Sequence, residues 1–267
     1  MENILAQAKK VAEEAEVFMV SAEETPVQFE ANRLKHIQSK QNTSVTLRII
    51  KQGKIGYATT TEPGDSQSLV NNALETAQFG MTARFEFPSP TPYPQIEVFD
   101  PDVESVSIAE MIKLGEELIT TVRGHTSDIM CEASVTKWVR TVGIINSHGG
   151  QANYKESVFC LGIEGHLIRG TDMLFVGESQ NSCHPLLEPK AIAEVVLQQL
   201  ELAKNQATVT SQPLPVVFTP NGVASALIPP LMTAFSGKTV LEGASPIGNR
   251  LGQPVFDEKL WLWDDPT

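Results

Sequence analysis

The side chains of this chain best suited to metal chemistry are five histidines, and their spacing does not favour a metal site. They are His36, His125, His148, His166 and His184. No two of them have the HxH or HxxxH spacing that places two imidazoles on one face of a strand or helix. Cys183 and His184 are adjacent, and adjacent side chains of an extended segment point to opposite faces. We therefore expect no metal and no cofactor.

Two other segments carry fragments of catalytic motifs. Ser236–Thr239 has the end of a phosphate-binding loop, but the position of the loop's first glycine is Met232, so we interpret Gly237 as a glycine that ends a helix. Ser245 lacks the second glycine of a nucleophile elbow, and no histidine follows it in the chain. We expect a loop serine there and predict no catalytic residue.

Charge and composition exclude several partners. The net charge of −12, without a cluster of Lys and Arg, would repel a phosphate backbone, so direct nucleic-acid binding is not expected. Residues 1–15 are too charged for a signal peptide, and no later run has the length of a membrane span. Three widely spaced cysteines, Cys131, Cys160 and Cys183, favour reduced thiols over disulfides. We expect a cytoplasmic protein with no membrane partner.

The elements that would position these residues alternate between helical and strand patterns. The first pass begins with a helix over 4–15 and ends with a helix that Asp65 caps and Gly80 ends. Between them the pattern predicts strands at 17–21, 27–31, 34–39, 44–50 and 55–59, the last two joined by a turn at Gly53.

The same order recurs after a proline-rich connector, 85–101. A capping box at Ser107 predicts a helix through Val122, followed by strands at 129–134, 139–146 and 156–163 and a helix over 189–204. Ser44 and Ser157 occupy matching places in the two passes. We interpret the two passes as a diverged duplication with repeats at about 1–82 and 105–208.

The expected fold class is α+β, with two domains. The first, 1–211, is a duplicated helix–antiparallel sheet–helix domain. The second begins at 212 and runs to 267 as the start of an incomplete β-rich domain, with a strand at Val216–Phe218. Thr219-Pro220 has the form of a helix start, and Pro229-Pro230 must break or kink that helix.

Two groups of segments resemble the PmbA/TldD family, which is also described as peptidase U62 and as a modulator of DNA gyrase. The first group is 29–34, 44–50 and 53–58; the second, which is more specific, is 215–220, 234–237, 251–255 and 264–267. The resemblance covers the whole chain. Because family members continue well past the final Asp-Asp-Pro-Thr, the resemblance implies a member truncated in its C-terminal domain.

The resemblance also implies a role. TldD-type members carry an HExxxH zinc motif, and Ile228, Pro229 and Thr233 stand at its positions in this chain. None of the three can replace a metal ligand or the general base. PmbA-type members also lack the motif and work beside a TldD-like protease subunit that trims or degrades small unfolded peptides. We therefore expect a non-catalytic PmbA/TldE-like subunit whose partners are a TldD-like protease subunit and unfolded peptides.

Two alternatives remain open at this point. One is a self-sufficient metallopeptidase with unusual ligands, and the other is an acidic regulator that binds DNA gyrase. Trp261 and Trp263 lie two residues apart and would share one face of a strand, as core or interface residues. We expect self-association through the apolar side chains of this tail, which are Val255, Phe256, Leu260, Trp261, Leu262 and Trp263.

Overall fold

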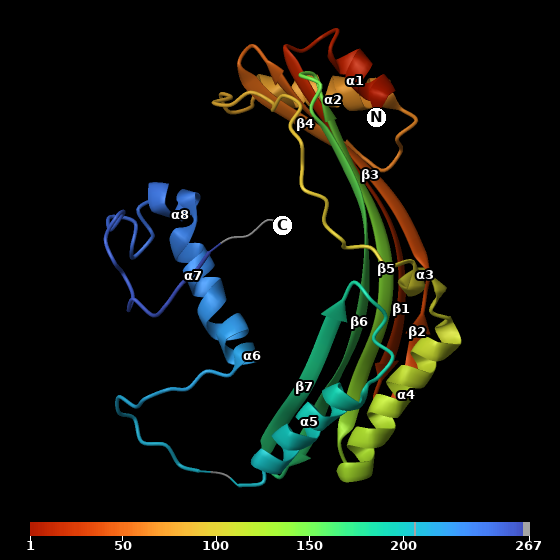
Figure 1. Cartoon of the computed structure of the whole chain (residues 1–267), viewed down its shortest axis with the longest axis vertical. Helices are drawn as coiled ribbons and strands as arrows, with labels where there is room; N and C mark the ends of the chain where they lie inside the picture. The colour runs from red at the N-terminus through yellow and green to blue at the C-terminus, as the bar shows by residue number, and fades with distance from the viewer. Residues whose placement is uncertain (206, 264–267) are drawn as a thin grey trace. The chain divides into compact units, whose positions relative to one another are not determined.

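The structure is a computed structural model that describes residues 1–205 and 207–263 (Figure 1). The Asp-Asp-Pro-Thr segment at 264–267 lies outside the described residues. By its internal contacts the chain forms two compact units, 1–206 and 207–267.

The first unit contains one antiparallel sheet and five helices among its described residues. Its elements are α1 (Glu2–Ala8), β1 (Glu14–Glu30), β2 (Arg33–Ile37), β3 (Lys40–Lys51), β4 (Lys54–Thr60), α2 (Ser66–Gln78), α3 (Pro101–Ser105), α4 (Ile108–His125), β5 (Met130–Asn146), β6 (Gln151–Arg169), β7 (Asp172–Ser182) and α5 (Lys190–Leu202). The strand order is β4-β3-β1-β5-β6-β7, and β2 pairs with the end of β1. This mixture of helices and antiparallel strands confirms the α+β class.

The central strand β1 is longer than predicted, because 17–21 and 27–31 belong to one strand. Pro26 lies where the partner of β1 changes, between the pair Glu24 and Lys40 of β3 and the pair Val27 and Ile37 of β2. The Pro26 carbonyl accepts from the backbone of Gln38, so its missing N–H also lies on that side of the strand. A proline at this change of partner interrupts neither ladder, and the predicted break was wrong.

Other boundaries also differ from the prediction. The segments 129–134 and 139–146 form the single strand β5, and β7 and α3 were not predicted at all. The first helix ends at Ala8 instead of Ala15, because Glu14 already pairs with Ile50 of β3. Pairing between strands that are distant in sequence decides these boundaries, and local sequence patterns cannot predict that pairing.

Helix caps and the first hairpin follow the prediction. The Asp65 carboxylate accepts from the Ser68 N–H at 3.1 Å at the start of α2, and the Ser107 hydroxyl accepts from the Glu110 N–H at 3.1 Å at the start of α4. Gln52 and Gly53 have φ of 51° and 69°, as a tight turn between β3 and β4 requires. These features depend on residues three or fewer apart, so the sequence contains them.

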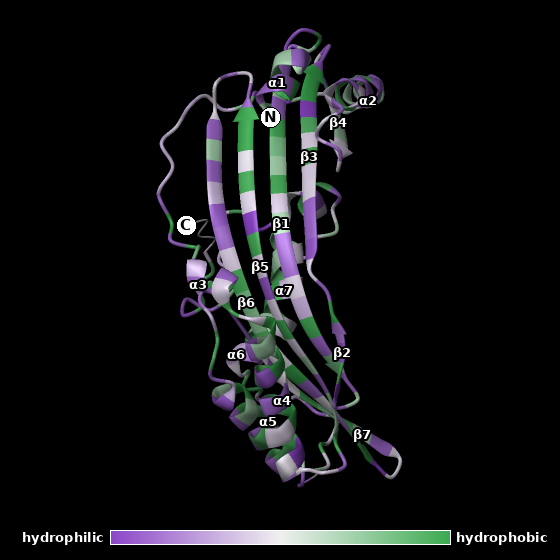
Figure 2. Ribbon diagram, turned by 90° about the vertical axis from the view of Figure 1, so that its right-hand side faces the viewer, coloured by the Kyte–Doolittle hydropathy of each residue, from purple (hydrophilic) through white to green (hydrophobic). Residues whose placement is uncertain are grey.

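Two hydrophobic cores lie on one face of the sheet, one near each end. Ala15 and Val17 of β1 pack with α1 and α2, whereas Val27 and Phe29 pack with α4 and α5. All four are odd-numbered residues of one continuous strand, so they point to the same face. Between the two cores the strands are largely polar, which Figure 2 shows as purple and white segments in the middle of β1 and β3.

The outer strands β4 and β7 are each capped, in the sense that a helix side chain hydrogen-bonds backbone groups of the strand. The helix is α2 for β4 and α5 for β7, and each of these helices ends one of the two predicted repeats. Thr76 of α2 accepts from the Tyr57 N–H at 2.9 Å and lies 2.8 Å from the Tyr57 carbonyl oxygen. Gln199 of α5 accepts from the Gly177 N–H and donates to the Gly177 carbonyl, both at 2.9 Å. From the centre outward the sheet therefore runs β1-β3-β4 on one side and β5-β6-β7 on the other. This symmetry supports the predicted duplication.

The second unit consists of helices and turns in its described part. Its helices are α6 (Pro220–Gly222), the π-helical turn η1 (Val223–Leu227), α7 (Ile228–Phe235) and α8 (Gly237–Leu241). The predicted strand Val216–Phe218 was wrong, because no described segment of this unit pairs with it, and an unpaired strand is not stable. Thr219 does cap a helix, since its hydroxyl accepts from the Gly222 N–H at 3.1 Å.

Candidate functional site

The positions expected for a zinc motif lie at the start and middle of α7. Ile228 and Pro229 directly follow the π-helical turn η1, and this wider turn accommodates the proline rings that would clash with the carbonyls one α-helical turn back. The predicted local break is thus a change of helix type. Thr233 carries the one side-chain oxygen among these three residues, and its hydroxyl donates to the Pro229 carbonyl at 3.0 Å. These side chains do not fit a zinc ion.

No other described residues assemble the donors of a metal site. Within 1–205 and 207–263, no group of three His, Cys, Asp or Glu side chains is close enough to hold an ion. Also within this part of the chain, no helix is long and apolar enough to span a bilayer.

Three histidines pair with carboxylates that are remote in sequence. His125 at the end of α4 contacts Glu201 of α5 at 2.5 Å, and His148 lies 3.4 Å from Glu14 of β1. The third, His184, lies 2.7 Å from Asp100, which precedes α3. Each pair joins two segments of the first unit, so these imidazoles have structural roles.

Asp100, His184 and Ser157 are the residue types of a catalytic triad, but their hydrogen bonds do not follow the pattern of a triad. The hydrogen bond from His184, followed by that from the Asp102 backbone, lowers the pKa of Asp100. Ser157 is 1% exposed, its hydroxyl donates to the Cys183 carbonyl at 2.8 Å and it accepts from the Asp100 N–H at 2.8 Å. A nucleophile must face substrate with its proton directed at a base, and Ser157 does neither. The cluster instead fastens the connector to β6.

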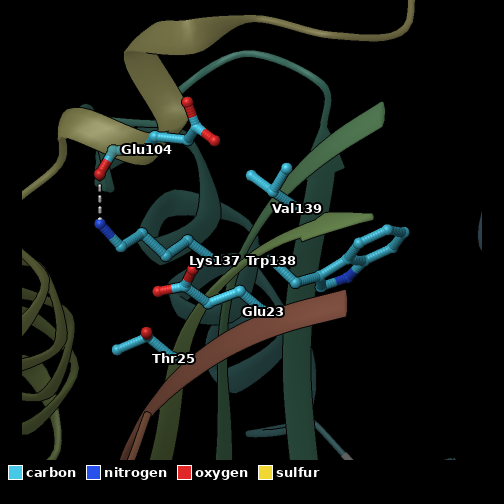
Figure 3. Close-up of a pocket in the computed structure, with 6 residues that line it drawn as sticks. All are labelled: Glu23, Thr25, Glu104, Lys137, Trp138 and Val139. Atoms are coloured by element: carbon cyan, nitrogen blue, oxygen red, sulfur yellow. Dashed lines mark hydrogen bonds between the residues drawn. The ribbon is translucent and has the colours of Figure 1, made fainter. Parts of the chain in front are cut away.

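A polar pocket lies on the helix-bearing face in the band between the two cores (Figure 3). Glu23 and Thr25 of β1 and Lys137 and Val139 of β5 line it as directly paired residues, together with Glu104 of α3. Its volume is roughly 200 Å³. Trp138 also borders it, but its ring points away from the other labelled side chains and lies 5.2 Å from the Arg140 guanidinium.

The pocket's lysine is engaged in holding α3. The Lys137 ammonium donates to the carbonyls of Glu104 and Val106, both at 2.6 Å, at the end of that short helix. Lys155 contacts the Glu104 carboxylate at 2.8 Å. The pocket could bind a small polar group, but its charges mainly stabilise the connector. Sequence patterns could not reveal it, because Glu23 and Lys137 meet only through the register of β1 and β5.

The remaining candidates from the sequence have ordinary structural places. Gly237 begins α8 instead of ending a helix, because Ser236 serves as the cap of both α7 and α8. The Ser245 hydroxyl donates to the Ala234 carbonyl at 2.7 Å, as suits a loop serine. Trp261 and Trp263 are 78% and 76% exposed and do not lie on a strand, so the expected shared strand face was wrong.

The three cysteines are free. Burial raises the pKa of Cys131 to about 11, and burial likewise raises the pKa of Cys160, with a smaller effect from Glu24. Both thiols are therefore weak nucleophiles at neutral pH.

Comparison with known proteins places these features in a family. Residues 15–78 match the family described as PmbA/TldA metallopeptidase domain 1, and residues 211–267 match the PmbA/TldA metallopeptidase C-terminal domain. An uncharacterized protein of Methanocaldococcus jannaschii is 24% identical over 275 residues, which cover 100% of this chain and 62% of that protein.

Three solved structures share the fold. TldE from Thermococcus kodakarensis has a TM-score of 0.78 at 18% identity, covering 93% of this chain and 57% of its own. Two proteins described as putative modulators of DNA gyrase, from Thermotoga maritima and Bacteroides thetaiotaomicron, have TM-scores of 0.83 and 0.84 at 17% and 16% identity. They cover 94% of this chain, which in turn spans 58% and 60% of theirs.

Proposed function

We propose, from the premise that this chain belongs to the PmbA/TldD family of metallopeptidase-related proteins, that it is a non-catalytic subunit of a TldD-type zinc protease. In this role a TldD-like partner holds the metal, and the complex processes or degrades small unfolded peptides. The chain contributes binding surface and geometry to the complex. The family relationship rests on the matches at both ends of the chain and on the shared fold.

The observation that carries the proposal is the donor set of α7. Zinc peptidases need two imidazoles and a carboxylate near a bound water. At the corresponding positions this chain presents an aliphatic side chain, a proline ring and a hydroxyl already bonded to the helix backbone. One of the solved structures that share this fold is named TldE. The family resemblance implies that such a protein works beside a TldD-like subunit, which is consistent with the proposed division of labour.

The proposal places the protein in the cytoplasm with its thiols reduced. Three free cysteines among the described residues support this location.

Metal analysis of the purified chain tests the absence of a catalytic centre. We expect less than stoichiometric zinc by mass spectrometry and no hydrolysis of a labelled unfolded peptide. A TldD-type zinc subunit, measured in the same way, serves as the positive control for zinc detection and for hydrolysis. Stoichiometric zinc in the unmodified chain, together with hydrolysis that a chelator stops, would favour a self-sufficient metallopeptidase.

A further inference from the structure

We propose that the open edge of β6, at residues 151–155, binds an extended segment of an unfolded polypeptide by strand addition. This inference rests on the proposed function and deepens it, because it states how the first unit would hold peptides of unrelated sequence.

The direction of the free backbone groups follows from one hydrogen bond. The Ser157 N–H donates to the Val98 carbonyl at 3.0 Å, on the side of β6 that faces away from β5. In an antiparallel strand the N–H and C=O of every second residue point to the same side. The backbone groups of Asn153 and Lys155 therefore also point away from β5, and no hydrogen bond in the described part of the chain engages them.

A few residues further along the chain, the same edge of β6 is already paired with another strand. β7 pairs with β6 from Phe159 and Ser182 onward, so the ladder positions of 151–155 continue a sheet edge that is already in use. The outer strands β4 and β7 are capped by Thr76 and Gln199, whereas the described residues provide no such cap at Asn153 or Lys155. An uncapped edge is a template for another extended chain.

The position of the connector favours a single extended chain, rather than the edge strand of a second sheet, as the occupant. It is fastened next to both ends of the open segment, where the Asn146 side chain donates to the Pro88 carbonyl at 2.9 Å and Ser157 bonds Val98. Figure 2 shows it passing beside the upper part of β6. Residues 91–97 are exposed, and within the described structure they form no hydrogen bond with β6. If two copies of the chain paired through this edge, their two connectors would occupy the same space and clash.

The recognition would depend on backbone groups and so would tolerate many sequences. Strand addition gives affinity through main-chain hydrogen bonds, while side chains of the added strand alternate between the two faces. Tyr154, 42% exposed, offers an apolar contact on the face without helices. On the other face Lys155 is engaged with Glu104 and lies 4.0 Å from the Phe99 ring, so no free charge selects a particular partner there.

Hydrogen exchange and a matched pair of variants test the proposal. The probe is a fluorescein-labelled unstructured decapeptide, with a version methylated at alternate backbone nitrogens as its control. We expect the amides of Asn153 and Lys155 to exchange quickly in the free chain and slowly with excess peptide. Asn153→Pro removes only an outward N–H and should weaken peptide binding about tenfold, whereas Asn153→Ala keeps that N–H and should change it less than about twofold.

Several results would overturn the proposal. They are equal affinity for the Pro and Ala variants when both melt like the parent chain, or no binding of the probe. A third is protection at Lys40–Ser44, the part of β3 that pairs with β1 but precedes its pairing with β4, in place of Asn153 and Lys155. Self-association of the free chain that Asn153→Pro abolishes would make a second copy the occupant and would also contradict it. None of these outcomes bears on the zinc content of α7, so this inference and the proposed function can fail separately.

Discussion

Gly115 of α4 and Phe29 of β1 are so close that a β-carbon built on the glycine would lie 2.2 Å from Cε2 of the phenylalanine ring. Phe29 is 2% exposed and has little room to move. Replacing Gly115 with Ala would improve helix propensity by about 1 kcal/mol, but overpacking a core commonly costs about 1–3 kcal/mol. We expect Gly115→Ala to lower the free energy of unfolding measured with urea.

Gly124 provides the matched control for this prediction, because it lies in the same helix and a β-carbon added to it would meet open space. Gly124→Ala should stabilise the protein by about 0.5–1 kcal/mol. Equal stabilisation by both substitutions would show that α4 does not pack on Phe29 as described.

This contact also illustrates what the sequence could and could not predict. The helix over α4 and its cap at Ser107 depend on neighbouring residues, and both were predicted correctly. Position 115 must be glycine because Phe29, 86 residues earlier in the chain, packs against it, and no local sequence pattern contains that contact. The polar pocket has the same origin, since Glu23 and Lys137 meet only through the pairing of β1 with β5. Strand β7 was missed because glycine and polar residues weaken its alternation.

The pair of Asp100 and His184 predicts a stability difference that depends on pH. Its hydrogen bonds lower the pKa of Asp100 below the ordinary value of 3.8. A carboxyl group with a lowered pKa stabilises the fold above its ordinary pKa, and this contribution is lost as the pH falls through the lowered value. Asp100→Asn, which keeps a cap for α3, should therefore reduce the melting temperature at neutral pH.

The difference between Asp100→Asn and the parent chain should shrink as the pH falls below 3.8. Ser107→Ala is the control, because Ser107 caps α4 with an uncharged hydroxyl, so its effect on the melting temperature should not change over this pH range. Thermal melts by circular dichroism at several pH values decide the matter. A difference that stays constant across this range would contradict an effect of the Asp100 charge.

The reactivity of the Cys131 thiol should depend on whether the chain is folded. Burial raises the pKa of Cys131 to about 11, so this residue should resist a thiol reagent at neutral pH in the native state and react once the chain is unfolded. Mass spectrometry of peptides after timed labelling measures each site. Fast labelling of native Cys131 would contradict its burial in the core of the first unit.

Self-association remains a prediction, and exposed apolar residues of the second unit motivate it. Leu241, Leu251, Trp261 and Trp263 are between 76% and 98% exposed. Covering apolar surface is worth roughly 25 cal/mol per Å², so these side chains favour a partner surface. Sedimentation of the chain beside a version ending near Gln212 should show association only for the longer one. Two monomers at the same concentration would refute this expectation.

The central claim is that this chain serves a metal-bearing partner without carrying a catalytic centre, and a titration tests it most directly. The measurement is the hydrolysis rate of a labelled unfolded peptide by a TldD-type zinc subunit as this chain is added. We predict that the rate rises and saturates near equimolar chain, that a chelator abolishes it, and that the chain alone gives no hydrolysis. A rate that does not respond to the added chain, or chelator-sensitive hydrolysis by the chain alone, would contradict the claim.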